Sequence, residues 1–161
     1  MTQLLEAIVS DRLRLRPIER RDVRTFGALG SDPLVFRYIP EIDHPFDADA
    51  WIRELTGNPE CYIRHAVELV DSGRVIGAIQ LNRRSNMLLQ VGYWFGRAYW
   101  GHGYATETLE ALLAFLDERT REPIHAAVHP ENAASRSVLE NNGFICLNRW
   151  LSDMMEYRRQ R

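Results

Sequence analysis

Hydrophobic and polar residues follow two different periods along this chain, and these periods predict its main elements. From Arg12 to Pro17 arginine and leucine alternate strictly, which predicts a half-buried strand with the arginines on one face. From Leu88 to Phe95 nearly every side chain is apolar, as in a strand covered on both faces. From Ala105 to Leu116 the apolar residues recur at helical spacing, so an amphipathic helix should follow that strand.

Turn and cap residues divide the rest of the chain. Gly30, Pro40 and residues 57–59 end three short helical segments, and Asp71-Ser72-Gly73 should join two strands in a hairpin. The expected helices are 19–29, 33–38, a segment capped by Asp47 that runs to Leu55, 105–116 and 133–141. The expected strands are 12–17, 62–70, 74–81, 88–95, 124–128, 144–150 and 154–158. This order predicts an α+β fold, a mixed and mostly antiparallel sheet of about seven strands flanked by helices.

Composition limits the class of protein. A chain of 161 residues is expected to form a single domain over residues 1–161, and its 45% apolar and 26% charged residues are ordinary for a globular chain. No apolar run approaches 18 residues, so a cytoplasmic protein without a membrane span is expected. The net charge of −2 argues against a nucleic-acid partner. Cys61 and Cys146 are expected to be small buried side chains, and the histidines show no metal-ligand spacing.

Glycines mark the turn between the strand 88–95 and the helix that follows it. Gly101 and Gly103 would let the backbone approach a ligand closely, and the first N–H groups of the helix are free to bind an anion such as phosphate. A tight strand-to-helix connection is an equally good explanation of the two glycines. A P-loop is excluded because the chain contains no lysine, and the dinucleotide fingerprint fails because Thr106 stands where a third glycine is needed.

The residues around this turn resemble a known motif. Gly-Tyr-Trp-Phe followed by Tyr-Trp-Gly-His-Gly-Tyr-Ala-Thr-Glu is similar to the acyl-CoA-binding motif of the GNAT superfamily of N-acetyltransferases, in its RimJ/RimL-like branch. The family pattern Gln/Arg-x-x-Gly-x-Gly/Ala falls on residues 100–105, with Trp100 at the Gln/Arg position. The resemblance extends to Asn142-Gly143-Phe144 and implies the same order of elements. It implies acetyl-CoA as co-substrate and direct acetyl transfer to a primary amine, on a peptide or protein N-terminus or a small molecule, and it leaves a homodimer open.

The resemblance also implies site residues. Backbone groups of Trp94, Phe95 and Gly96 would pair with the pantetheine arm, and the Phe95 N–H would face the oxyanion. Asn132 would contact the cofactor, and Ser135 would hydrogen-bond or protonate the leaving thiolate. A plainer alternative is that Asn132 caps the helix and Ser135 lies in its first turn. The expected cofactor contacts are Trp94, Phe95, Gly96, Arg97, Trp100, Gly101, His102, Gly103, Tyr104, Ala105, Thr106, Asn132, Ser135 and Arg136.

The general base and the acceptor are less clear from the sequence. Gln90 occupies the strand position where members of the branch often carry an acidic residue, which leaves Glu107 and Glu156 as weak candidates for the base, or a buried water chain to Glu68 or Glu156. Without a base, an α-amine is about 10% neutral at pH 7 and a lysine amine below about 0.1%, which favours α-amines. A set of acidic residues should border the acceptor cleft in this fold, although an ordinary solvated helix face explains them too. These are Glu41, Asp43, Asp47, Asp49 and Glu54.

Two other functions fit part of the pattern. A non-catalytic acyl-CoA-binding or sensor protein of the same fold would explain the absence of an evident base. A nucleotide-binding structural module would explain the glycine turn alone. Binding of CoA with no release of free thiol in the presence of amines would favour the sensor. Stabilisation by CoA but not by NAD or ATP would exclude the nucleotide module.

Overall fold

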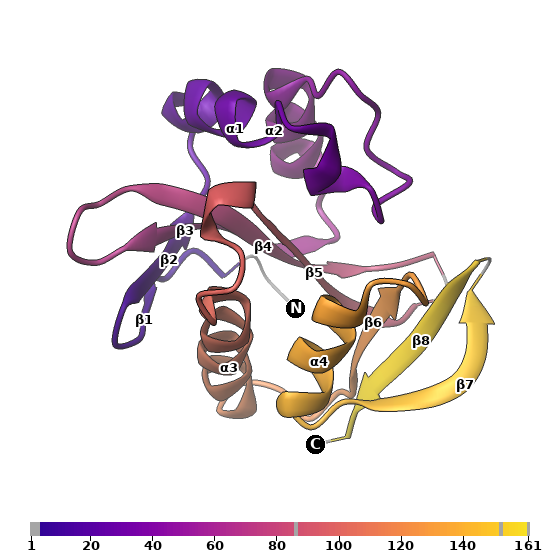
Figure 1. The fold of residues 1–161 in the computed structure, drawn as a ribbon. Helices are drawn as coiled ribbons and strands as arrows, with labels where there is room; N and C mark the ends of the chain where they lie inside the picture. The colour runs from indigo at the N-terminus through magenta and orange to yellow at the C-terminus, as the bar shows by residue number, and fades with distance from the viewer. Residues whose placement is uncertain (1–3, 86, 152, 161) are drawn as a thin grey trace.

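The computed structural model describes residues 4–85, 87–151 and 153–160 (Figure 1). It contains one eight-stranded sheet with the spatial order β1-β2-β3-β4-β5-β6-β8-β7. The strands are β1 Ile8–Val9, β2 Leu13–Pro17, β3 Cys61–Leu69, β4 Val75–Arg83, β5 Leu89–Phe95, β6 Ile124–Val128, β7 Ile145–Leu151 and β8 Met154–Arg159. The predicted mixed, mostly antiparallel α+β sheet is confirmed. The additional strand is β1, whose two residues pair with β2 and are too few to leave a periodic pattern.

Helices cover both faces of the sheet, with α1 and α2 on one face and α3 and α4 on the other (Figure 1). Their bounds are α1 Val23–Leu29, α2 Ala48–Gly57, α3 Tyr104–Asp117 and α4 Ala133–Asn141, and three 3-10 turns are η1 Arg20–Asp22, η2 Pro33–Phe36 and η3 Arg97–Tyr99. The helix expected from Glu19 is wrong at its start. The Asp22 N–H donates to the Glu19 carbonyl oxygen (2.9 Å), which closes a 3-10 turn before α1 begins, and the Asp22 carboxylate caps this turn by accepting the Glu19 N–H (2.8 Å).

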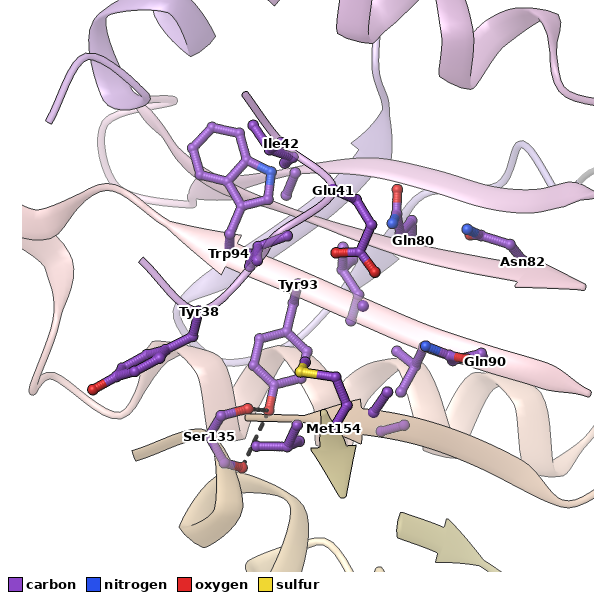
Figure 2. Close-up of a pocket in the computed structure, with 18 of the residues that line it drawn as sticks. Tyr38, Glu41, Ile42, Gln80, Asn82, Gln90, Tyr93, Trp94, Ser135 and Met154 are labelled. Carbon is purple, nitrogen blue, oxygen red and sulfur yellow. Dashed lines mark hydrogen bonds between the residues drawn. The ribbon is translucent and has the colours of Figure 1, made fainter. Parts of the chain in front are cut away.

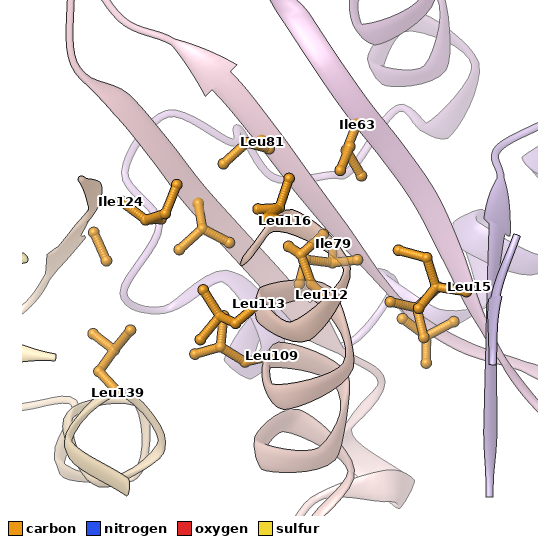
Figure 3. Close-up of a cluster of buried hydrophobic side chains, with 14 of the residues drawn as sticks. Leu15, Ile63, Ile79, Leu81, Leu109, Leu112, Leu113, Leu116, Ile124 and Leu139 are labelled. Atoms are coloured by element: carbon orange, nitrogen blue, oxygen red, sulfur yellow. The ribbon is translucent and has the colours of Figure 1, made fainter. Parts of the chain in front are cut away.

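The apolar stripe of α3 packs on the sheet as its helical spacing predicts (Figure 3). Leu109, Leu112 and Leu116 are each 0% exposed, and they share one cluster with Ile79 and Leu81 of β4. A second cluster fills the opposite face beneath α1 and α2 and is rich in aromatic residues. Because both faces carry a core, the central strands are apolar on both sides.

Strands β5 and β6 diverge in the middle of the sheet. They pair in parallel at Gln90 and His125, whereas β4 and β5 stay paired along the whole of β5, as far as Gly77 and Phe95. Strand β6 instead pairs with β8 along its whole length, from Ile124 to Val128. Within the described chain, the C-terminal half of β5 therefore has a strand partner on one side and a gap on the other.

The arginines of β2 do not share one environment. Arg14 is exposed as expected, but Arg16 is only 7% exposed. Its guanidinium donates two hydrogen bonds to Asp22 (2.8 Å each) and one to Glu68 (2.5 Å). The alternation of β2 is therefore interrupted by a buried ion-pair network that joins β2, η1 and β3.

The two cysteines differ in burial. Cys61 is 0% exposed, and burial raises the pKa of its thiol to about 11. Cys146 lies on the edge strand β7 and is only partly buried, so the expectation of burial is wrong for this residue. An edge strand lacks a neighbour on one side, which leaves more of its side chains open to solvent. Among the described residues, no helix is both long and apolar enough to cross a bilayer.

His65 gives the fold a specific acid sensitivity. It is 1% exposed on β3, and its Nε2 lies 2.7 Å from the Glu6 carbonyl oxygen. Burial lowers the pKa of its imidazole, because the charged form loses its hydration, and this effect outweighs the hydrogen bonds to the backbone of Glu6 and Arg64, which raise the pKa. A lowered pKa means that stability is complete above the unfolded-state value of about 6.5 and is lost as the pH falls below it.

We therefore expect urea-derived unfolding free energies to fall between pH 7.5 and pH 5.5, by up to about 1.4 kcal/mol per pH unit below 6.5. His65→Gln should flatten this dependence because the glutamine does not titrate. His44→Gln is the control, since His44 is exposed and should leave the slope unchanged. An unaltered slope in His65→Gln would assign the acid sensitivity to other groups.

Candidate active site

Two cavities meet at the C-terminal half of β5. The first, which we call the α3 cavity, has a volume of about 600 Å³ and lies between β5, residues 99–106 at the start of α3, and residues 131–138 at the start of α4. The second, the α2 cleft, has a volume of about 280 Å³ and lies between β4, β5, β6 and the segment that leads into α2. Six residues line both: Tyr38, Ile39, Tyr93, Trp94, Asn132 and Ser135. A molecule in the α3 cavity can therefore meet a molecule in the α2 cleft at these residues.

Within the residues that the structure describes, the turn before α3 presents unpaired backbone donors to the α3 cavity. Gly101 and Gly103 have φ angles of 76° and 77°, in the left-handed region that glycine adopts without strain. Along α3, the N–H of Glu107 bonds back to the Gly103 carbonyl oxygen (3.1 Å). The N–H groups of residues 104–106 precede this bond, and these residues line the α3 cavity. Three donors at the positive end of a 14-residue helix form a favourable environment for an anion.

Arg12 holds this turn in place. Its guanidinium donates to the His102 carbonyl oxygen (3.0 Å) and lies 4.6 Å from the centre of the Tyr104 ring. Glu107 accepts hydrogen bonds from the Arg12 backbone N–H (2.9 Å), the Arg12 Nε (2.6 Å) and the Ser10 hydroxyl (2.7 Å). Partial burial alone would raise the pKa of Glu107, but these hydrogen bonds outweigh it and lower the pKa. Glu107, a weak candidate for the general base, is thus an anchor between β2 and α3.

Successive residues of β5 direct their backbone N–H and C=O groups to opposite edges of the strand. Gly96 donates its N–H to the Ile76 carbonyl oxygen (3.0 Å), and Trp94 lies opposite Ala78, so both residues direct their main chain toward β4. The expectation that Trp94 and Gly96 offer free backbone groups to a ligand is therefore wrong. Alternate residues of a strand point the other way, which aims the Phe95 N–H at the gap between β5 and β6. The Phe95 carbonyl oxygen accepts a hydrogen bond from the Trp100 indole N–H (2.9 Å).

A tyrosine and a serine meet where the two cavities join (Figure 2). The Tyr93 hydroxyl lies 3.0 Å from Ser135 Oγ and 3.4 Å from the Ser135 carbonyl oxygen. Burial raises the pKa of Tyr93 to about 12, so the phenol stays protonated and can donate to Ser135. Asn132 caps α4, because its Oδ1 accepts the Ser135 N–H (3.1 Å), as its cap interpretation predicts. Tyr93 was not singled out in the sequence, where it belongs to an unbroken aromatic run.

The structure brings most of the expected cofactor residues together and separates four of them from the cavity. Trp94, Phe95, Trp100, Gly101, Gly103, Tyr104, Ala105, Thr106, Asn132 and Ser135 line the α3 cavity. Gly96, Arg97, His102 and Arg136 lie outside this lining. Arg97 pairs with Asp32 (3.2 Å), and Arg136 donates to the Tyr157 hydroxyl (3.1 Å). The His102 Nδ1 lies 2.8 Å from the Trp100 carbonyl oxygen, so its ring helps to shape the turn.

The α2 cleft has a polar floor. The side-chain amides of Gln80, Asn82 and Gln90 rise from β4 and β5, and Glu41 stands over them (Figure 2). Glu54 also lines the cleft. The other acidic residues of this region lie outside its lining: Asp47 caps α2, Asp49 pairs with Arg53, and Asp43 makes no contribution to the lining.

The remaining candidates for the base are held within the protein. Glu68 pairs with Arg16 (2.5 Å) in the buried network of β2 and β3. Glu156 is 3% exposed, and its Oε1 lies 2.8 Å from the Nδ1 of His125. Neither residue lines the α2 cleft. The described residues contain no group of three or more histidine, cysteine or acidic side chains arranged to hold a metal ion.

Known proteins are similar to this chain in sequence and in fold. The family model described as "Acetyltransferase (GNAT) domain" matches residues 12–145. The chain is 29% identical to the uncharacterized protein YkkB of Bacillus subtilis (strain 168) over an alignment of 163 residues, and this alignment covers 95% of each protein. It is 25% identical to an acetyltransferase of the GNAT family from Bacillus anthracis, whose crystal structure superposes with a TM-score of 0.77 over 95% of this chain and 96% of that one.

The RimJ protein of Mycobacterium smegmatis, solved in complex with CoA-disulfide, has the same fold. Its TM-score is 0.77 at 20% identity, over 97% of this chain and 88% of the other. The match to the family model extends from the start of β2 to the start of β7 and so includes the turn before α3, the whole lining of the α3 cavity and the lining of the α2 cleft except Met154. This chain belongs to the GNAT acetyltransferase family, with RimJ-like and RimL-like proteins among its structural neighbours.

Proposed function

We propose that this protein is an N-acetyltransferase that transfers an acetyl group from acetyl-CoA directly to a primary amine. The observation that carries the proposal is the meeting of the two cavities at Tyr93 and Ser135. One cavity ends at a helix N-terminus suited to a diphosphate, and the other has a polar floor suited to an amine-bearing molecule. Transfer through a ternary complex needs this arrangement, because holding two reactants in contact contributes up to about 7–11 kcal/mol to catalysis.

The α3 cavity supplies the groups that acetyl-CoA requires. The N–H groups of residues 104–106 would bind its diphosphate, and the open edge of β5 would pair with the amides of its pantetheine arm. The Phe95 N–H points into the gap between β5 and β6, where the thioester oxygen would lie. An N–H aimed at a developing oxyanion is worth about 3–4 kcal/mol.

Ser135 would serve the leaving thiolate. Tyr93 remains protonated, so its hydroxyl can donate to Ser135 Oγ and leave the serine proton free to point at the sulfur. The α-amine of a peptide or a small molecule is the favoured acceptor, because it is partly neutral without a base and the candidate carboxylates Glu68, Glu107 and Glu156 are engaged elsewhere.

The test is acceptor-dependent release of free CoA thiol. Purified protein with acetyl-CoA should release thiol when peptides with free N-termini or small amines are added, and mass spectrometry should find the acetyl group on the amine. CoA binding without any acceptor-dependent release would support a non-catalytic acyl-CoA sensor instead. Thermal stabilisation by CoA but not by NAD or ATP would separate both from a nucleotide-binding module.

Tyr93→Phe should lower kcat about tenfold, since the loss of one hydrogen bond to Ser135 corresponds to roughly 1–1.5 kcal/mol. The KM for acetyl-CoA should stay within about twofold, because the variant keeps the aromatic ring that lines both cavities. Tyr62→Phe provides the control: it removes a hydroxyl on β3 that is bonded to Glu60 and to Arg83 of β4, away from the α3 cavity and the α2 cleft. An unchanged kcat in Tyr93→Phe would show that Ser135 needs no help from the phenol.

A further inference from the structure

We infer that the Trp94 indole N–H and the Gln80 side-chain amide recognise an amide group of the acceptor, next to the amine that is acetylated. This inference rests on the proposed function and names the chemistry that the α2 cleft selects. It assigns a recognition role to two side chains that the transfer step itself does not use.

Both side chains carry buried polar atoms without a partner. Trp94 is 7% exposed, and within the described residues its Nε1 has no hydrogen-bond acceptor. The side-chain oxygen of Gln80 is likewise buried, and it too has no hydrogen-bond donor among the described residues. Buried polar groups in native proteins are nearly always hydrogen-bonded. A donor and an acceptor left without partners in one wall of a cleft therefore point to a ligand that supplies the complementary pair.

The two groups are neighbours. Gln80 lies opposite Gly92 in the β4–β5 ladder, and Trp94 is two residues further along β5 on the same face. The Cα atoms of such diagonal neighbours are about 7–8 Å apart. Both line the α2 cleft, and Figure 2 shows them rising from the sheet on the side where Glu41 lies. Tyr93, which lies between Gly92 and Trp94 in the chain, reaches Ser135.

Local packing holds each group in its place. The Trp94 ring touches three aromatic rings from α1, η2 and α2, with centroid distances of 5.6 Å to Phe26, 4.8 Å to Phe36 and 5.5 Å to Trp51. The indole is therefore fixed and cannot turn to find another acceptor. Gly92 leaves room for Gln80, because a Cβ at this position would lie 3.3 Å from the Gln80 Nε2.

An amide matches this wall. Its carbonyl oxygen can accept from Trp94 while its N–H donates to the Gln80 oxygen, so one group satisfies both open atoms. A protonated polyamine offers donors alone and would leave the Trp94 N–H buried without an acceptor. The acceptor with this chemistry is an amine followed by an amide, as at the N-terminus of a peptide. Glu41 and Glu54, which also line the cleft, would attract its ammonium form.

The experiment uses amide isosteres. A panel of peptide amides with each of the twenty residues first and alanine second identifies the best acceptor, alongside spermidine and glucosamine. Two analogues of that peptide are then made: an ester in place of the first peptide bond, which lacks the N–H, and an alkene, which lacks both groups. Each is assayed by thiol release with wild type, Trp94→Phe and Gln80→Leu.

The expected pattern is selective. The best peptide should exceed spermidine and glucosamine at least tenfold in kcat/KM. Trp94→Phe should reduce kcat/KM about tenfold for the peptide and its ester but hardly for the alkene, because one hydrogen bond is lost. Gln80→Leu should reduce it for the peptide and spare the ester. CoA affinity should be unchanged in Gln80→Leu, because Gln80 lines the α2 cleft and not the α3 cavity, which separates recognition of the acceptor from general damage.

The inference is overturned if either variant lowers kcat/KM equally for the peptide, ester and alkene, since that is the result of a merely structural role. It is also overturned if spermidine or glucosamine is the best acceptor. Both results leave the N-acetyltransferase proposal intact. If no amine in the panel is acetylated, the proposed function itself fails, and the inference falls with it.

Discussion

Arg16→Met is expected to lower the free energy of unfolding by about 3–5 kcal/mol, because it leaves two buried carboxylates without their cation. The side chains of Arg16, Asp22 and Glu68 are 9%, 5% and 13% exposed. Methionine retains the apolar stem but offers no hydrogen-bond donor. Urea denaturation at pH 7, followed by circular dichroism, measures the loss.

The pH dependence provides a second readout. Burial alone would raise the pKa of Asp22, but the hydrogen bonds from Arg16 and from the Glu19 N–H lower it. A lowered carboxyl pKa gives stability that is present above the unfolded-state value of about 3.9 and is lost as the pH falls through the folded-state value. Without Arg16 this contribution disappears. The difference in unfolding free energy between wild type and variant should therefore narrow as the pH falls below about 4.

Arg53→Met is the matched control for this prediction. Arg53 forms an ion pair with Asp49 one turn away on α2, but the two side chains are 64% and 39% exposed. Exposed pairs of this kind contribute about 0.3–0.5 kcal/mol. If Arg16→Met costs no more than Arg53→Met, the buried network is not a main source of stability.

Gly101→Val is expected to weaken CoA binding about 100-fold. Gly101 has a φ of 76°, which costs an ordinary residue about 1–2 kcal/mol and a β-branched residue more. A Cβ at this position meets no heavy atom within 4 Å, so the effect comes from the backbone and not from a clash. The valine variant relieves the strain by changing the turn, which moves the N–H groups of residues 104–106 away from a bound diphosphate. Isothermal titration calorimetry with CoA measures the change in Kd.

Gly73→Val matches this variant outside the site. Gly73 has a φ of 67° in the β3–β4 turn, and again no heavy atom lies within 4 Å of a Cβ placed there. Both variants should lose similar thermal stability, but Gly73→Val should bind CoA as wild type does. Equal Kd values for the two variants would mean that the turn before α3 does not hold CoA.

Local patterns predicted the elements well where burial follows a regular period. The apolar spacing of α3 predicted a helix because it places one side of the helix in the core. The continuous apolar run of β5 predicted a strand because both of its faces are covered. Irregular elements were missed. The two-residue strand β1 and the 3-10 turn before α1 depend on single hydrogen bonds and pairings that leave no period in the sequence.

In the candidate site too, local features could be predicted from the sequence, whereas contacts between distant residues could not. Gly101 and Gly103 lie in one short turn, so their role as left-handed positions could be predicted from residue type alone. The Tyr93–Ser135 pair joins residues 42 positions apart, and the Arg12–Glu107 pair joins residues 95 positions apart. No local pattern links such partners. The wrong assignment of free backbone groups to Trp94 and Gly96 has the same origin, because the direction of each N–H depends on which neighbour β5 pairs with.

The sequence by itself determined the order of strands and helices, the glycine turn before α3 and the family resemblance, since these depend on residues close together in the chain. Only the tertiary structure decided which polar groups meet. It placed Tyr93 against Ser135, buried Arg16 between two carboxylates, and left the Trp94 N–H and the Gln80 oxygen without partners in the wall of the α2 cleft. The physical reason is that burial and hydrogen bonding between distant segments exist only after the sheet has assembled.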